Sequence, residues 1–177
     1  TLILGKSGGG KSYCVKLEIL RSMMFGTQIF VIDPENEYQY LSDMVGGTSV
    51  KVSISSEDHI NPFDLPKPRE DETPADVLRS HIVDLGGFFK MLLGTVTPVE
   101  DSVLDEAIRQ TYAARDINET SDFATITPPL MSDFQSVLSG MQGAESILIR
   151  IKKYTEGSFA GFLNNPTNVQ LDNQLVV

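Results

Sequence analysis

GKSGGGKS, residues 5–12, is the stretch that decides how the rest of the chain is interpreted. It fits the pattern G-x-x-x-x-G-K-[ST], which is typical of loops that bind nucleotide phosphates between a strand and a helix. The apolar residues 2–4 predict the strand, and residues 12–25 predict an amphipathic helix that ends at Gly26. Because both flanks are present, we interpret the glycines as a phosphate-binding loop rather than as a turn that matches by chance.

Each residue type in this loop has a chemical purpose. Gly8, Gly9 and Gly10 let the backbone wrap closely around an anion, so that its N–H groups point inward. Lys11 is predicted to bring its ammonium group to the outer phosphates, and the Ser12 hydroxyl is predicted to bind Mg²⁺. The predicted nucleotide-binding residues are the whole loop and its next neighbour: Gly5, Lys6, Ser7, Gly8, Gly9, Gly10, Lys11, Ser12 and Tyr13. The predicted cofactors are therefore ATP and Mg²⁺.

A second apolar segment, IFVI at residues 29–32, predicts a strand that is covered on both faces of a parallel sheet. Together with the first strand and the helix it forms a predicted βαβ unit. Asp33, Glu35 and Glu37 follow this strand, at the edge of the sheet where ligands bind. We predict that Asp33 holds the metal through water, and that Glu35, with Lys11, is catalytic because a carboxylate can position or polarise the attacking water. The alternative is a solvated acidic turn, because Pro34 reverses the chain at once.

From residue 73 to residue 154 the sequence has the apolar spacing of helices. Two start signals, TPAD at residues 73–76 and TPVE at residues 97–100, each place an N-cap threonine before a proline and an acid. Two prolines at residues 128–129 precede a shorter helix, and a last helix runs through residues 147–154. Four successive helices therefore follow the βαβ start.

Strands are predicted again outside this helical region, at residues 50–54 and on either side of residues 172–173. The predicted fold class is α/β, with a P-loop core built on a parallel sheet and an inserted all-α subdomain. We place the βαβ core at residues 1–60, the insertion at residues 61–156 and the return to the core sheet at residues 157–177. Both ends fall inside apolar runs and no initiator methionine is present, so we expect a piece of a longer protein.

The composition narrows the classes of partner. Lys and Arg number 14 against 24 Asp and Glu, a net charge of -10, which opposes non-specific binding of DNA or anionic lipid by the whole surface. The net charge of the whole chain does not exclude a local basic groove. The single cysteine, Cys14, cannot form an internal disulfide, which favours a reducing, cytoplasmic compartment. No apolar run in the sequence has the length of a membrane span.

Five further motifs, taken with the phosphate loop, resemble one family. They are VIDPENEY (residues 31–38), INPFDL (60–65), TPVEDSVLDEAIRQTY (97–112), ITPPLMSDFQSVL (126–138) and FAGFLNNPTNVQLDNQLVV (159–177). In order and spacing they are similar to the TraC/TraE-like transfer ATPases of type IV secretion and bacterial conjugation, in the HerA–FtsK group of P-loop motors. The resemblance covers nearly the whole chain.

The resemblance implies a RecA-like P-loop NTPase core and ATP hydrolysis that powers pilus assembly or substrate transfer. It also implies a hexamer of the full protein, contacts with other secretion-channel and coupling ATPases, and a peripheral position on the cytoplasmic face of the inner membrane. Residue by residue, it assigns nucleotide and Mg²⁺ binding to Gly5, Gly10, Lys11 and Ser12. Asp33 and Glu35 match the family's acidic motif, while Lys6 departs from it, because such loops often carry proline or a small residue there.

The family's remaining catalytic groups are expected downstream of the final apolar run. These are the Walker B carboxylates, a glutamine-type sensor and the arginine fingers, which are worth about 10³ to 10⁵ in rate. The resemblance therefore implies a P-loop ATPase whose present chain, ending before Walker B, binds phosphates and is weak or inactive in hydrolysis.

Two alternative functions stay open at this point. One is a DNA translocase of the HerA/FtsK type, which would need a basic pore that the acidic composition does not favour. The other is a non-catalytic nucleotide-binding or interaction module, in which the βαβ unit only supports the helical insertion. The sequence does not decide whether DNA is bound directly.

Overall fold

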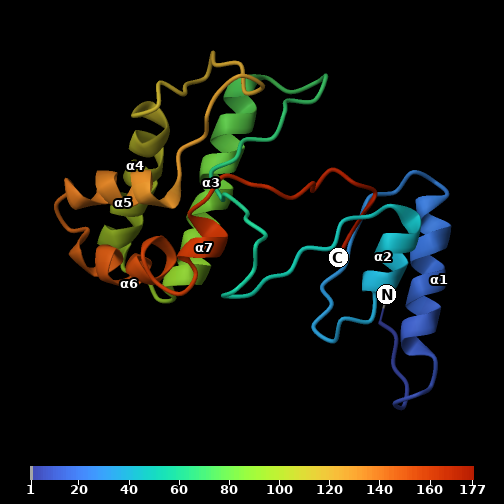
Figure 1. Ribbon diagram of the computed structural model, residues 1–177. Coiled ribbons are helices and arrows are strands. Elements are labelled where there is room, and N and C mark those ends of the chain that lie inside the picture. The colour runs from blue at the N-terminus through green and yellow to red at the C-terminus, as the bar shows by residue number, and fades with distance from the viewer. Residues whose placement is uncertain (1) are drawn as a thin grey trace. The chain divides into compact units, whose positions relative to one another are not determined.

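The chain folds into two units. The first unit contains both ends of the sequence, and the second contains the residues between them. In the computed structural model, which describes residues 2–177, the first unit contains residues 2–51 and 169–177, and the second contains Val52–Asn168. We call them the loop unit and the helical unit. Figure 1 shows the C-terminal segment, in red, returning to the N-terminal part, where its strand β2 pairs with β1.

The loop unit contains two helices and a small parallel sheet. Helix α1 (Lys11–Met23) follows the glycine loop directly, and Gly26, with a φ of 74°, ends the turn that comes after it. Helix α2 spans Gln39–Val45. The sheet consists of β1 (Ile29–Phe30) and β2 (Leu175–Val176), which run parallel.

Strand β2 lies between β1 and the segment that contains Thr48. Ile29 pairs with Leu175 in the sheet register, and Thr48 forms a parallel bridge to Val176 on the other side. The backbone N–H of Thr48 donates to the Leu175 carbonyl oxygen at 2.8 Å. Segments far apart in the sequence are therefore joined by backbone hydrogen bonds, and the side chain of Asn173 adds a bond to Thr48 Oγ1 at 2.7 Å.

The structure corrects several predictions about strands. Residues 2–4 form no strand, because they have no hydrogen-bonded neighbour within residues 2–177, and Leu4 is exposed. The strand predicted at residues 50–54 is also wrong, since pairing in this region centres on Thr48. The predicted hairpin around residues 172–173 is replaced by the single strand β2, which pairs in parallel with distant segments.

The helical unit contains five helices that pack on one another. They are α3 (Pro74–Leu93), α4 (Pro98–Ala113), α5 (Met131–Ser139), α6 (Glu145–Thr155) and α7 (Ala160–Leu163). Helix α4 packs on α3 and α5, and α6 packs on α3, α5 and α7. The helices predicted from residues 73–154 are confirmed, whereas α2 and α7 were not predicted.

Helices α3 and α4 begin with capping boxes, as their sequences predict. Thr73 and Asp76 bond each other's backbone N–H groups at the start of α3, and Thr97 and Glu100 do the same at the start of α4. The Thr97 N–H donates to Glu100 Oε2 at 2.8 Å. Each box satisfies two N–H groups that a helix N-terminus otherwise leaves without partners.

Aromatic rings form the centre of the core in the helical unit. Phe63 is completely buried and contacts the rings of Phe89, Tyr112 and Phe134 at centroid distances of 5.7 to 5.9 Å. The Tyr112 hydroxyl donates to the Phe63 carbonyl oxygen at 2.9 Å. Phe63 lies outside the helices, so this contact fixes the INPFDL segment against α3, α4 and α5.

The entry and exit of the helical unit are bonded to each other through asparagine side chains. Asn168 Oδ1 accepts from the His59 N–H at 2.7 Å, and Asn168 Nδ2 donates to the Glu57 carbonyl oxygen at 2.8 Å. Asn61 is buried, and its Nδ2 donates to the Pro129 carbonyl oxygen at 3.0 Å. The segments by which the chain enters and leaves the helical unit are therefore bonded within that unit.

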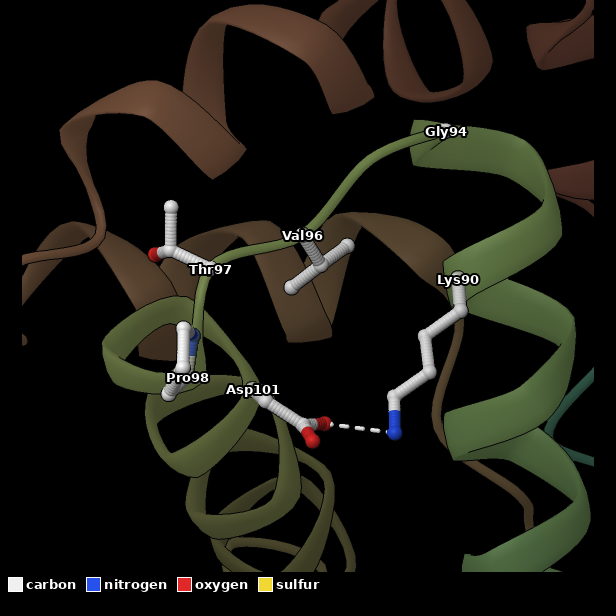
Figure 2. Close-up of a pocket in the computed structure, with 6 residues that line it drawn as sticks. All are labelled: Lys90, Gly94, Val96, Thr97, Pro98 and Asp101. Carbon is white, nitrogen blue, oxygen red and sulfur yellow. Dashed lines mark ion pairs between the residues drawn. The ribbon is translucent and has the colours of Figure 1, made fainter.

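The connection between α3 and α4 is held by two ion pairs. Figure 2 shows Lys90 on α3 and Asp101 on α4 directed toward each other, with Nζ and Oδ1 2.7 Å apart. Arg150 on α6 pairs with Glu100 and also donates to the Leu93 carbonyl oxygen at 3.1 Å. Glu100 and Arg150 are mostly buried, so this pair joins α4 and α6 to the end of α3.

Of the helices in residues 2–177, none combines the length and the apolar composition required to cross a membrane.

Candidate phosphate-binding site

The glycine loop adopts a backbone conformation that requires glycine. Gly8 and Gly10 have φ angles of 74° and 80°, in the left-handed region that residues with a Cβ adopt at a cost. The Gly9 N–H donates to the Lys6 carbonyl oxygen at 3.0 Å, and a Cβ on Gly9 would lie 2.9 Å from that same oxygen. The loop therefore requires glycine for its backbone conformation at Gly8 and Gly10, and for lack of space at Gly9.

The N-terminus of α1 has no competing anion of its own. The N-cap is Gly10, which has no side chain to accept from the first N–H groups, and the first turn contains no acidic residue. Residues 5–10 are exposed. Free N–H groups and the positive end of the helix dipole attract a phosphate at such a position.

The Lys11 side chain folds back over the loop. Its Nζ donates to the carbonyl oxygens of Gly5 at 3.1 Å and Lys6 at 3.0 Å. No carboxylate among residues 2–177 forms an ion pair with it. The ammonium group therefore lies at the loop with its charge available to an anion.

Asp33 organises the acidic turn that follows β1. Its Oδ2 accepts from the Tyr38 N–H at 2.8 Å. Desolvation raises the pKa of Asp33, but hydrogen bonds from the backbone N–H groups of residues 35–38 outweigh it and lower the pKa below 3.8. Asp33 is thus a carboxylate that stays ionised and holds its own turn closed.

Glu37 connects this turn to the phosphate loop. The Ser12 hydroxyl donates to Glu37 Oε2 at 2.5 Å, across 25 residues of sequence. The next residue, Tyr38, has the Lys16 ammonium 5.3 Å above its ring, which adds a second contact between the turn and α1. Sequence reasoning placed Glu37 among the acids of this turn but assigned it no role, because the spacing of alternate acids does not indicate which one faces Ser12.

The predicted site residues fall into two groups. Residues 5–13 form one continuous loop and first helical turn, with Tyr13 exposed. The acidic turn contacts this group through Glu37; within residues 2–177 the Glu35 side chain has no hydrogen bond or ion pair, and Asp33 bonds only its own turn. The roles of Asp33 with a metal and of Glu35 with water stay predictions.

The residues present fit a nucleotide with Mg²⁺. The loop supplies a tight turn at the start of α1 with no space for a Cβ on Gly9, Lys11 supplies a cation, and Ser12 supplies a hydroxyl oxygen with an acidic residue beside it. Mg²⁺ is commonly held by few protein oxygens together with substrate phosphates and water. The chemistry supported by this donor set is binding of a phosphate chain together with its cation.

The hollow between α3 and α4, shown in Figure 2, is a weaker candidate. It has a volume of about 320 Å³ and is lined by Lys90, Gly94, Val96, Thr97, Pro98 and Asp101. Its two charged side chains pair with each other and are half exposed. Each therefore neutralises the group that a ligand would need.

Two comparisons with known proteins found similarities to this chain. The family model described as "Helicase HerA, central domain" matches residues 1–175. The solved structure "Structure of VirB4 of Thermoanaerobacter pseudethanolicus" is similar over 98% of this chain, with a TM-score of 0.79 and 25% sequence identity. The chain spans 47% of that VirB4 chain. No curated protein sequence matches.

These matches show a P-loop NTPase fold and confirm the resemblance to the HerA–FtsK group that the sequence motifs predicted. The fold is expressed here as mostly helical structure with a small parallel sheet. The chain therefore belongs to the family of the HerA helicase central domain.

Proposed function

We propose that the chain is the nucleotide-binding part of an ATPase that powers type IV secretion or conjugation, by pilus assembly or by substrate transfer. The observation that carries this proposal is the phosphate loop, in which Lys11 and Ser12 stand at the start of α1 without a competing acidic cap. The similarity to VirB4, a type IV secretion ATPase, supports the choice of machine.

In this proposal the loop unit is part of a RecA-like core and the helical unit is an all-α insertion. The proposed limits are those expected from the sequence, with the insertion at residues 61–156. ATP and Mg²⁺ are the cofactors. Residues 5–13 bind the nucleotide, with Lys11 on the outer phosphates and the Ser12 oxygen on the cation.

Binding and hydrolysis are separate expectations for this chain. The loop unit provides the groups that hold phosphates, whereas Walker B, sensor and arginine-finger groups are what the family uses for hydrolysis. We expect weak or no turnover by these 177 residues alone. In the whole protein we propose a hexamer on the cytoplasmic face of the inner membrane, in contact with other secretion-channel and coupling ATPases.

Calorimetry with Mg²⁺ and a non-hydrolysable ATP analogue tests the proposal. The Lys11→Ala variant should bind roughly 10- to 100-fold more weakly, because a charge-assisted hydrogen bond contributes about 1.5 to 3 kcal/mol. Lys152→Ala is the matched control, since it removes the same charge from an exposed position on α6. Equal affinity of the Lys11→Ala variant and the wild type, or no binding by the wild type, would contradict the proposal and favour an interaction module.

A DNA translocase is the second candidate function, and it is favoured because the matching family is that of the helicase HerA. The net charge of -10 argues against it. Titration of labelled duplex and single-stranded DNA at increasing salt distinguishes the two. A translocase should bind DNA with an affinity that falls steeply with salt, whereas the secretion ATPase proposed here should show little binding.

A further inference from the structure

We propose that Glu37 is a positioning residue. Its carboxylate accepts a hydrogen bond from the Ser12 hydroxyl and thereby orients the Ser12 oxygen toward the nucleotide's Mg²⁺. The inference rests on the proposed function and deepens it, because it assigns a role to a residue that the phosphate-loop pattern does not include. It gives the acidic turn a connection to the phosphate loop that Asp33 and Glu35 do not show.

The geometry singles out Glu37 among the acids of its turn. Its Oε2 lies 2.5 Å from Ser12 Oγ, a distance typical of a hydroxyl that donates to an ionised carboxylate. Ser12 is in the first turn of α1, directly after Lys11. Glu35, two residues away in the same turn, is exposed and has no such contact within residues 2–177.

The turn holds Glu37 in place through Asp33. The Tyr38 backbone N–H donates to Asp33 Oδ2 at 2.8 Å, which fixes the backbone directly after Glu37. Tyr38 is half-buried beneath Lys16 of α1. Two contacts of Tyr38 therefore hold the backbone next to Glu37, besides the bond of the Glu37 side chain to Ser12, which indicates a built arrangement rather than a chance encounter.

The chemistry of a serine ligand explains why an acceptor is needed. A hydroxyl has one proton and two lone pairs, so an oxygen that gives a lone pair to a cation must direct its proton elsewhere. A carboxylate is the strongest acceptor available among side chains. Partners of this kind fix the orientation of a metal ligand, and their loss typically reduces metal affinity by about 10- to 100-fold.

The negative charge of Glu37 should also change the affinity for nucleotide, in opposite directions with and without Mg²⁺. A carboxylate beside bound phosphates repels them, and a divalent cation between the two reverses that repulsion. Glu37 should therefore weaken the binding of nucleotide without Mg²⁺ and strengthen the binding of nucleotide with Mg²⁺. The ratio of the two affinities measures this effect separately from hydrolysis.

The test is calorimetric titration of the full chain with ADP, in the presence of Mg²⁺ and in the presence of EDTA. The dependence on Mg²⁺ is expressed as a ratio, the dissociation constant in EDTA divided by the dissociation constant in Mg²⁺. Glu37→Ala should reduce this ratio about 10- to 100-fold. Glu37→Gln should retain part of it, because its amide oxygen still accepts the Ser12 proton. Glu18→Ala is the matched control and should leave the ratio unchanged, because Glu18 is an exposed acid of α1.

An unchanged or larger ratio in Glu37→Ala overturns the inference, since a larger ratio would mean that the Ser12–Glu37 bond competes with the cation. An equal reduction in Glu18→Ala also overturns it, because the effect would then be that of general charge. Absence of any ADP binding by the wild type contradicts the proposed function itself, and this inference with it. Circular dichroism of each variant shows whether the helices remain intact.

Discussion

The loop unit and the helical unit bury their apolar residues very differently. The extended hydrophobic core lies within the helical unit, around Phe63 and the inward faces of α3 to α6. The loop unit buries Ile19 of α1 and the two residues of β2, but it leaves Leu4 82% exposed and Ile32 97% exposed. One unit is organised by packing, and the other by backbone geometry.

The difference follows from where each kind of structure finds its hydrogen bonds. A helix satisfies its backbone within its own segment, so α3 to α6 need only their apolar faces covered. The small sheet needs neighbours: β2 is held by backbone bonds to β1 and to Thr48. The phosphate loop, which has the proposed function, belongs to the unit with the smaller core. Function and core packing should therefore respond to different substitutions.

The largest expected effect is that of Phe63→Ala in the helical unit. Phe63 is completely buried and contacts three other aromatic rings. Its truncation should lower the free energy of unfolding by about 3 to 5 kcal/mol, because the lost burial and the remaining cavity both cost free energy. Urea unfolding followed by far-UV circular dichroism measures this change. The same variant, below its unfolding transition, should keep the wild-type affinity for nucleotide.

Val83→Ala is the control for this prediction, because Val83 lies on the same unit and is 70% exposed. Its stability should remain close to that of the wild type. A loss of nucleotide affinity in folded Phe63→Ala would show that the two units are coupled. It would contradict the expectation that function and core packing respond to different substitutions.

The next effect should appear in the loop unit without a loss of core. In Gly9→Ala the new Cβ would lie 2.9 Å from the Lys6 carbonyl oxygen, so the loop must shift. Strain of about 1 to 3 kcal/mol corresponds to roughly 30-fold weaker nucleotide binding at its midpoint. Calorimetry with the ATP analogue measures this. Gly161→Ala, where the new Cβ meets nothing within 4 Å, should bind as the wild type does.

The same contrast explains which parts of the fold could be predicted from the sequence. The starts of α3 and α4 were predictable, because Thr73 and Thr97 each precede a proline and an acid within four residues. A capping box is complete in a single short segment. No distant residue has to be known for the helix start to be predicted.

The strands could not be predicted in the same way. The segment at residues 50–54 alternates as a strand does, yet the observed pairing lies at Thr48 because the position of β2 sets the register. In the site, the loop followed from its glycines, but the choice between Glu35 and Glu37 depended on the path of the turn around Asp33. That path is set by hydrogen bonds that spacing does not reveal.

Acid should weaken the helical unit through Glu100. Hydrogen bonds from the Thr97 N–H and the Ser146 hydroxyl, with the Arg150 charge, lower the pKa of Glu100 from 4.5 to about 2. The stabilisation is complete above pH 4.5 and is lost as the pH falls toward 2, because the folded protein must then protonate a bonded carboxylate. Unfolding midpoints of the wild type and Glu100→Gln should converge over this range.

Glu106→Gln provides the control for general charge, since Glu106 is an exposed acid of the same helix. Its difference from the wild type should stay small throughout the range. A gap between the wild type and Glu100→Gln that is independent of pH would contradict the role given to the Glu100 carboxylate.

The smallest expected effect is a gain, from Gly87→Ala in α3. Gly87 has helical geometry, and a Cβ there meets nothing within 4 Å, so alanine should raise the free energy of unfolding by about 0.5 to 1 kcal/mol. Gly46→Ala in the loop unit is the contrasting variant. Gly46 is equally free of close contacts but has a φ of 71°, so alanine should cost about 1 to 2 kcal/mol there.

Both variants add one methyl group to open space, and only the backbone conformation differs between them. Urea unfolding of the two proteins should therefore give free-energy changes of opposite sign. A loss of stability in Gly87→Ala would mean that the middle of α3 needs the freedom of glycine, and packing alone would no longer account for the helical unit. A gain in Gly46→Ala would remove the claim that the loop unit depends on left-handed backbone positions.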